Sequence, residues 1–194
     1  MSGGAAIRSG MSPAEYLAFE RAADEKHELF AGEVFAMSGG TRQHSLIATN
    51  VAAELRAALP CEVHGSDMRV KVEAAQSYAY PDASVVGGER RFEDERRETL
   101  LNPILIVEVL SESIEAHDGG KKFEHYRQID SLAEYVLVSQ RERHIEQFVR
   151  QADGTWNLRE ARAGGRLELP SLGCALAVDE VYLKVFDDAA AAGA

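Results

Sequence analysis

The chain has 194 residues, of which 45% are hydrophobic, and a formal net charge of −11. These values predict one globular domain with a substantial core. They exclude a membrane-spanning helix, because no apolar run approaches about 18 residues, and they argue against an extended basic surface for nucleic acid. We expect a disordered leader over residues 1–10, a single domain over residues 11–185 and a disordered alanine-rich tail over residues 186–194.

The cysteines and the N-terminus bear on the compartment. Cys61 and Cys174 lie far apart in the sequence and match no metal-binding spacing. The N-terminal residues lack the apolar stretch of a secretory signal. We therefore expect a cytoplasmic protein that keeps its thiols reduced.

Apolar periodicity, turn residues and capping signals predict alternating helices and strands. Ser12, Pro13 and Glu15 mark the start of a capped helix, and Ala31-Gly32 is the turn of a hairpin. The predicted elements are the hairpin over residues 27–38, a helix over 42–59 capped by Thr41 and ended by Pro60, strands over 61–73, 78–86 and 103–110, a helix over 119–129, strands over 134–139 and 144–150, and C-terminal strands with a small helix capped by Asp179.

Two carboxylates lie on neighbouring predicted strands. Glu108 lies near the end of the apolar run ILIVEVL, which is typical of a strand buried on both faces. Asp82 follows Pro81 in YAYPDASVV, where a proline favours a strand start, an edge or a bulge. Neighbouring strands lie about 4.8 Å apart, so these carboxylates can share one hard cation. Oxygen-only ligands favour Mg²⁺ or Mn²⁺ over zinc.

Other polar residues allow two interpretations. Glu28 and Glu33 bracket the hairpin turn, either as solvated carboxylates or with one turned toward the metal site. His44, in the first turn of its helix, is either structural or points into a cleft. A lysine at the start of the helix after Glu108 can orient a water for attack. The alternative for Asp82, Glu108 and this lysine is an ordinary set of buried ion pairs.

Residues 87–101 are dense in charges of both signs. A solvated loop or short helix is the simpler interpretation of this segment. Its four arginines, Arg90, Arg91, Arg96 and Arg97, are nevertheless the most concentrated basic group in the chain. If a phosphodiester backbone binds to the protein, this insertion is the candidate surface.

One motif series resembles a known family. Pro81-Asp82, then Glu108-Val109-Leu110-Ser111, then Asp118-Gly119-Gly120-Lys121-Lys122 with Tyr126 resembles the Uma family of restriction-endonuclease-like proteins. The likeness extends over roughly residues 28–183. It implies an α/β (α+β) fold of the restriction-endonuclease type, with a mixed β-sheet flanked by helices, an N-terminal β-hairpin and C-terminal strands.

The resemblance also implies roles for particular residues. In the PD-(D/E)xK core of such nucleases, Asp82, Glu108 and the carbonyl of Val109 would bind Mg²⁺, for which Mn²⁺ can substitute. The lysine normally follows the glutamate by two residues, where this chain has Leu110. Lys122 matches the position to which the family has moved it, and Lys121 is a weaker candidate. Glu28 and His44 match recurring family positions and join the catalytic candidates.

The sequence departs from the family pattern at the loop Ser111-Glu112-Ser113-Ile114 and at Val136 and Ser139. These departures concern packing and loop shape more than chemistry. The expected function is metal-dependent hydrolysis of nucleic acid, DNA in the first instance, by a homodimer whose two sites cut two strands. Two alternatives stay open: a catalytically inactive interaction or regulatory protein with the same fold, and a hydrolase of smaller phosphate esters.

Overall fold

The computed structural model describes residues 5–37, 39–58, 60–110 and 118–186, with the side chains of residues 118–121 outside the description. In chain order the elements are α1 (Pro13–Ala22), β1 (His27–Phe30), β2 (Glu33–Ala36), α2 (Arg42–Ala58), β3 (Glu62–Gly65), β4 (Arg69–Val72), β5 (Ser77–Ala79), β6 (Ala83–Val86), β7 (Thr99–Leu100), β8 (Leu105–Leu110), α3 (Asp118–Tyr126), β9 (Glu134–Ser139), β10 (His144–Arg150), β11 (Trp156–Arg162), β12 (Arg166–Leu169), β13 (Cys174–Ala177) and α4 (Val178–Val181). In this part of the chain no helix is long and apolar enough to cross a membrane.

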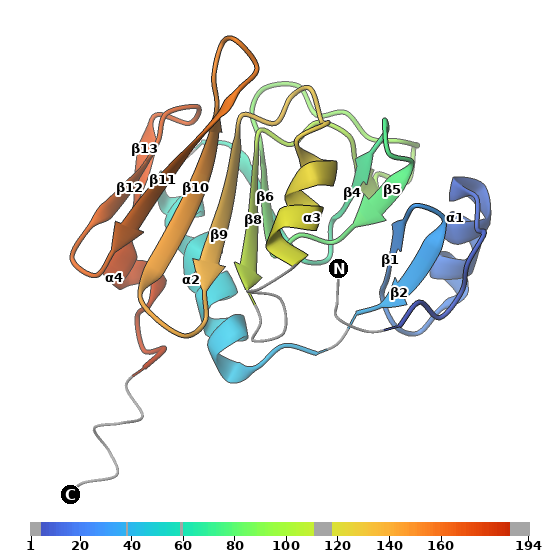
Figure 1. Cartoon of the computed structure of the whole chain (residues 1–194), viewed down its shortest axis with the longest axis horizontal. Coiled ribbons are helices and arrows are strands. Elements are labelled where there is room, and N and C mark those ends of the chain that lie inside the picture. The colour runs from blue at the N-terminus through green and yellow to red at the C-terminus, as the bar shows by residue number, and fades with distance from the viewer. Residues whose placement is uncertain (1–4, 38, 59, 111–117, 187–194) are drawn as a thin grey trace, which may run out of the picture.

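A six-stranded mixed sheet forms the centre of the molecule, in the order β11-β10-β9-β8-β6-β3. The neighbours β8 and β9 are parallel and the other pairs are antiparallel. Helix α2 covers one face and α3 the other, as Figure 1 shows. β8 is buried along most of its length, as its apolar run predicts. The predicted mixed sheet flanked by helices is therefore confirmed.

A five-stranded sheet, β2-β1-β5-β4-β7, lies beside the central one and carries the N-terminal hairpin. Its existence corrects the prediction of single strands over residues 61–73 and 78–86. A turn at Ser66-Asp67 separates β3 from β4, and Pro81-Asp82 separates β5 from β6. In both places the chain passes from one sheet to the other. Pro81 has no N–H for a strand ladder, which favours a break at this position.

Local signals account for the first helices and the hairpin. Ser12 Oγ accepts from the Glu15 N–H at 3.3 Å, and the Glu15 carboxylate accepts from the Ser12 N–H at 2.9 Å, which is the predicted capping box. Ala31 and Gly32 have φ values of 50° and 79°, as a tight hairpin turn requires. Thr41 Oγ1 accepts from the His44 N–H at 3.1 Å at the start of α2.

The two ends of the described chain contact the domain. Arg8, within the expected leader, forms a β-bridge with Val34, and the ring of Phe186 stacks on that of Tyr182 with centroids 5.6 Å apart. Residues 1–4 and 187–194 lie outside the described residues. The prediction that Asp179 caps the last helix is wrong: the N-cap is Ala177, and Asp179 lies inside α4, where it pairs with Arg143.

Candidate metal and nuclease site

The carboxyl end of β8 brings Asp82 and Glu108 together. β6 pairs with β8 so that Ala83 lies opposite Val107, which places Asp82, one residue before β6, level with Glu108. The Val109 N–H donates to Asp82 Oδ2 at 2.7 Å. The break at Pro81 thus lets the Asp82 side chain bind the backbone of β8 where the antiparallel ladder ends.

Lys122, on α3, binds the carboxylates of two strands. Its Nζ lies 3.0 Å from Glu28 Oε1 and 3.2 Å from Glu108 Oε1. One turn further along α3, the Tyr126 hydroxyl donates to Glu108 Oε1 at 2.8 Å. All four side chains are buried. Helical i, i+4 spacing therefore directs both donors of α3 to the same glutamate.

The hairpin supplies Glu28 to this cluster and leaves Glu33 out. Glu28 is 1% exposed, and besides Lys122 it accepts from the Tyr80 N–H at 3.3 Å. Glu33 is exposed at the start of β2. Glu28 thus lies in the buried cluster with Lys122, whereas Glu33 is an exposed residue of the hairpin.

His44 approaches Asp82 from the other side of the sheet. Its Nε2 lies 3.2 Å from Asp82 Oδ1. The hydrogen bond to Asp82, opposed by partial burial, raises the pKa of His44. A Cβ added at Gly40 would lie 2.9 Å from His44 Nδ1, so the missing side chain at Gly40 leaves room for the imidazole ring. His44 is therefore partly buried and lies beside Asp82, within reach of this cluster.

The cluster holds more negative than positive charge. Burial, together with Asp82 and Glu28 and against the pull of Lys122, raises the pKa of Glu108 to about 7. Burial alone would lower the pKa of Lys122, but Glu108 and Glu28 outweigh it and raise that pKa, so the ammonium stays protonated. Three carboxylates thus face one lysine and one histidine, and the excess favours a further proton or a cation.

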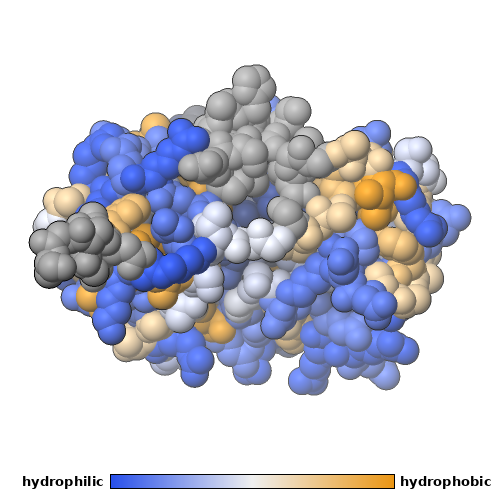
Figure 2. Space-filling view, turned by 90° about the horizontal axis from the view of Figure 1, so that it is seen from below, coloured by the Kyte–Doolittle hydropathy of each residue, from blue (hydrophilic) through white to orange (hydrophobic). Residues whose placement is uncertain are grey.

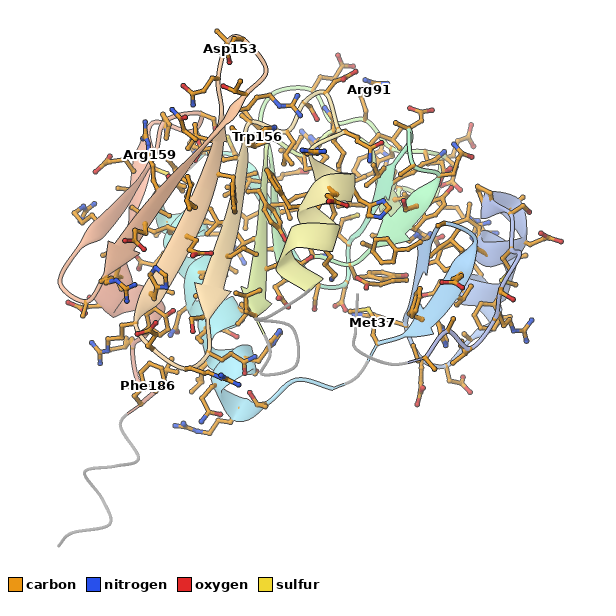
Figure 3. The ribbon with its side chains drawn as sticks, viewed as in Figure 1. Met37, Arg91, Asp153, Trp156, Arg159 and Phe186 are labelled. Atoms are coloured by element: carbon orange, nitrogen blue, oxygen red, sulfur yellow. The ribbon has the colours of Figure 1, made fainter. Side chains whose placement is uncertain are left out.

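A pocket of about 620 Å³ opens beside Asp82 and His44. Met37, Gly40 and Ser45 also line it, and Figure 3 places Met37 at the same end of the molecule as the end of β8. Figure 2 looks at this end, where the visible surface is mainly hydrophilic. Asp82 is therefore reachable from solvent, while Glu108 and Lys122 lie deeper.

Sequence reasoning brought the main residues together but missed three contributions. The bond from Tyr126 to Glu108, the backbone bond from Tyr80 to Glu28 and the space left by Gly40 depend on packing between distant segments. Only Tyr126 carried a signal, its spacing of four residues from Lys122. The side chain of Lys121 and the loop over residues 111–117 lie outside the described part of the chain.

The four arginines of residues 87–101 do not form one surface. Arg90 pairs with Glu62 of β3 at 2.7 Å. Arg91 is bonded to Asn102, before the start of β8, and so lies at the end of the sheet opposite the site (Figure 3). Arg96 and Arg97 line a different pocket beside α1. Only Arg96 and Arg97 share a pocket, so the candidate phosphate surface of residues 87–101 is reduced to these two arginines.

Comparisons with known proteins identify the family of this chain. A family model named Uma2 and described as "Putative restriction endonuclease" matches residues 13–179. The Synechocystis sp. protein slr1290 is 38% identical, over 89% of this chain and 91% of its own length, and sll1609 of the same organism is 35% identical, over 77% and 86%. Both are uncharacterized proteins by name.

A solved structure supports the fold. The crystal structure of a protein from Anabaena variabilis, titled a "putative nuclease belonging to DUF820", superposes with a TM-score of 0.74 at 15% identity. The match covers 89% of this chain and 98% of the other. At this identity the comparison establishes the restriction-endonuclease-like fold.

Proposed function

This chain belongs to the Uma2 family of restriction-endonuclease-like proteins, and on that premise we propose that it is a Mg²⁺-dependent nuclease that hydrolyses phosphodiester bonds of nucleic acid. The observation that carries the proposal is the meeting of Asp82 and Glu108 at the carboxyl end of β8, with Lys122 on the buried side of Glu108. Restriction-type cutting of two strands would be done by a homodimer, with DNA as the first substrate to test.

The donor set fits a hard divalent cation. Asp82 and Glu108 offer carboxylate oxygens, and a carboxylate has about four lone-pair positions, so the bonds already made leave room for a metal. The Val109 N–H faces Asp82, and the N–H and C=O of one strand residue point to the same side, which favours its carbonyl as a third oxygen. Among the described residues no group of three His, Cys, Asp or Glu side chains could hold a metal. Mg²⁺ is the candidate cation because it commonly binds through one or two carboxylates, with waters and substrate phosphates as its other ligands.

The residues of the site would have different roles in the hydrolysis. A bound Mg²⁺ would supply activation of water and neutralise charge on the phosphate. The protonated Lys122 would orient the attacking water and stabilise negative charge that develops on the phosphate. Glu28 holds the ammonium of Lys122, and Tyr126 holds the carboxylate of Glu108. His44 fixes the Asp82 side chain through Oδ1.

The test combines calorimetric titration with Mn²⁺ and a cleavage assay on plasmid DNA, oligonucleotides and mononucleotides. The wild type should bind Mn²⁺ and cut polynucleotides, and Asp82→Asn should lose both properties. Lys122→Met should keep metal binding and cut about 10²-fold or more slowly. Glu33→Gln, on the exposed hairpin turn, is the matched control and should behave as the wild type.

Three results would overturn parts of this proposal. Metal binding without cleavage of any polynucleotide would favour an interaction or regulatory protein that retains the fold. Cleavage of mononucleotides alone would indicate a hydrolase of small phosphate esters. No Mn²⁺ binding, even with an oligonucleotide present, would reduce Asp82, Glu108 and Lys122 to structural ion pairs.

A further inference from the structure

A second pocket, of about 510 Å³, lies between α1, the start of β4 and the loop before β7. Its lining contains five basic side chains, Arg21, Lys26, Arg69, Arg96 and Arg97, and five acidic ones. The pocket is thus locally neutral in a chain whose formal net charge is −11. Positive charge is concentrated here relative to the rest of the protein.

Arg69 has an unused hydrogen-bond donor that faces this pocket. The residue is 3% exposed and its guanidinium lies within 6 Å of the rings of Tyr16, Tyr78 and Tyr80. Nε donates to Thr99 Oγ1 at 2.9 Å and Nη1 donates to the Tyr80 hydroxyl at 3.1 Å. Nη2 is buried without a hydrogen-bond partner. An unmade bond of this kind costs about 1–3 kcal/mol, so it requires an explanation.

Glu98 lies over the unused donor without bonding to it. Its Oε2 is 4.0 Å from Arg69 Nη2 and accepts a hydrogen bond from Arg21 Nε at 3.2 Å. The Glu98 side chain is 43% exposed, and both Arg69 and Glu98 line the pocket. A small displacement of this exposed carboxylate would therefore open Nη2 to an anion from the pocket.

Arg96 and Arg97 supply further positive charge at the mouth of the pocket. Both are exposed, and in the described part of the chain neither has a carboxylate oxygen within 4.0 Å of its guanidinium. Their backbone N–H groups bond to Asp94, at 3.0 Å for Arg96 and 3.2 Å for Arg97. The turn is thus fixed while both guanidinium groups remain available.

This pocket adjoins the one at Asp82 and His44. Glu25 and Lys26 line both pockets, and the consecutive residues Ser66 and Asp67 line one each. Lys26 Nζ donates to Ser66 O at 3.1 Å, which fixes this lysine where the two pockets meet. A chain of phosphates that enters the site at Asp82 can therefore continue past Lys26 to Arg69.

We propose that the pocket of Arg69, Arg96 and Arg97 is a subsite for a backbone phosphate of the nucleic-acid strand whose scissile bond lies at Asp82 and Glu108. The ligand takes the place of the Glu98 carboxylate and completes the hydrogen bonding of Arg69. Arginine suits this task because its planar donors match phosphate oxygens. This inference rests on the proposed nuclease function, and it assigns the direction in which the strand leaves the site.

The test measures binding of a fluorescein-labelled single-stranded oligonucleotide to the full chain by anisotropy, with EDTA present and over a salt series. The double variant Arg96→Ala/Arg97→Ala should weaken binding about tenfold and reduce the slope of log K against log salt by about 0.7 for each phosphate that the protein no longer neutralises. The matched control Arg159→Ala/Arg166→Ala removes equal charge at exposed positions, with Arg159 on β11 across the molecule from α1 (Figure 3). It should stay within twofold of the wild type.

Glu98→Gln should change the affinity for the oligonucleotide in the opposite direction. It removes the competing charge and retains an oxygen for Arg21, so it should tighten binding several-fold. Equal weakening by both double variants, or unchanged or weaker binding by Glu98→Gln, overturns the subsite. Inorganic phosphate at constant ionic strength tests the ligand source: binding of phosphate that depends on Arg96 and Arg97, without such dependence for the oligonucleotide, overturns the assignment to a nucleic-acid backbone.

Because the binding assay is run in EDTA, without metal and without cleavage, it tests the phosphate subsite independently of the nuclease proposal. Asp82→Asn, which cannot cut, should bind the oligonucleotide at least as tightly as the wild type in EDTA and keep the dependence of binding on Arg96 and Arg97, because it removes a carboxylate next to the scissile phosphate. A wild type that binds through Arg96 and Arg97 but never cuts refutes the nuclease proposal and leaves the phosphate subsite standing. A wild type that cuts while the Arg96→Ala/Arg97→Ala variant binds like its control refutes the subsite alone.

Discussion

Two polar clusters lie side by side in this molecule, and each leaves a group of opposite charge incompletely paired. In the acidic cluster, made of Glu28, Asp82, Glu108, Lys122 and His44, carboxylates outnumber the cations. The basic cluster is built around Arg69, whose guanidinium keeps one nitrogen without a hydrogen bond. The excess of carboxylates favours a bound cation, and the unused donor of Arg69 favours a bound anion. Incompletely paired groups, more than cavity size, thus indicate which kind of ligand each cluster would favour.

Tyr80 lies between the two clusters and bonds to both. Its N–H donates to Glu28 at 3.3 Å, whereas its hydroxyl donates to Glu20 at 2.8 Å and accepts from Arg69. Arg69 and the carboxylates of the acidic cluster do not pair directly. A direct ion pair would use the carboxylates and the unused donor of Arg69 together, and the neutral tyrosine keeps these groups apart.

The largest expected effect comes from removing the cation of the acidic cluster. Lys122→Met should lower the free energy of unfolding by about 4 kcal/mol in EDTA, because it leaves the buried carboxylates of Glu28 and Glu108 without their ion pair. Urea unfolding followed by circular dichroism measures this loss. Lys184→Met, at an exposed position, is the control and should change stability by less than about 0.5 kcal/mol. If both variants lost the same free energy of unfolding, the carboxylates of the acidic cluster would not depend on the charge of Lys122.

A smaller effect depends on pH. Burial raises the pKa of Glu108 from 4.5 to about 7 on folding, so in this range the folded chain binds more protons than the unfolded chain. The contribution of Glu108 to stability is therefore present below pH 4.5 and declines as the pH rises to about 7, by roughly 3 kcal/mol. Glu108→Gln should remove this decline, as measured by urea unfolding in EDTA from pH 4.5 to 8.

The exposed Glu33→Gln is the control for that experiment, since it should retain the pH dependence of the wild type. A Glu108→Gln variant with the same pH dependence as the wild type would mean that the Glu108 carboxylate is fully compensated by Lys122 and Tyr126. In that case the acidic cluster would have no excess charge to offer a metal, and its contrast with the basic cluster would disappear.

The sequence predicted the elements that local chemistry determines. The capping box at Ser12, the hairpin turn at Ala31-Gly32 and the strands β9 and β10 agree with the structure, because caps, turns and short apolar patterns are set by neighbouring residues. The passage of the chain between two sheets at residues 66–67 and 81–82 was missed. The apolar pattern of each strand does not record which sheet that strand joins.

The acidic cluster was largely predictable and the basic cluster was not. Asp82, Glu108 and Lys122 belong to one motif series that lies just before β6, on β8 and on α3. Arg69 alternates with Met68 and Val70, a pattern that indicates a solvent-facing side chain, yet it is 3% exposed. Its burial depends on the five-stranded sheet and on tyrosines from α1 and β5, and no local sequence pattern predicts those contacts.

The smallest predicted effect tests whether the two clusters are separate. Tyr80→Phe removes the hydroxyl that bonds Glu20 and Arg69 but retains the ring and the backbone bond to Glu28. It should lower the free energy of unfolding by about 2 kcal/mol, because buried polar groups lose partners, and leave Mn²⁺ affinity within twofold of the wild type. Tyr135→Phe is the matched control, since that buried hydroxyl has no hydrogen-bond partner in the described part of the chain.

A double-mutant cycle makes the separation quantitative. If the clusters are independent, the losses of Tyr80→Phe and Lys122→Met should add to within about 0.5 kcal/mol. A coupling energy above about 1 kcal/mol, or a tenfold change in Mn²⁺ affinity from Tyr80→Phe alone, would mean that one hydrogen-bond network joins Arg69 to Glu108. The cation and the phosphate would then bind cooperatively, because each ligand would neutralise charge that also acts on the other cluster.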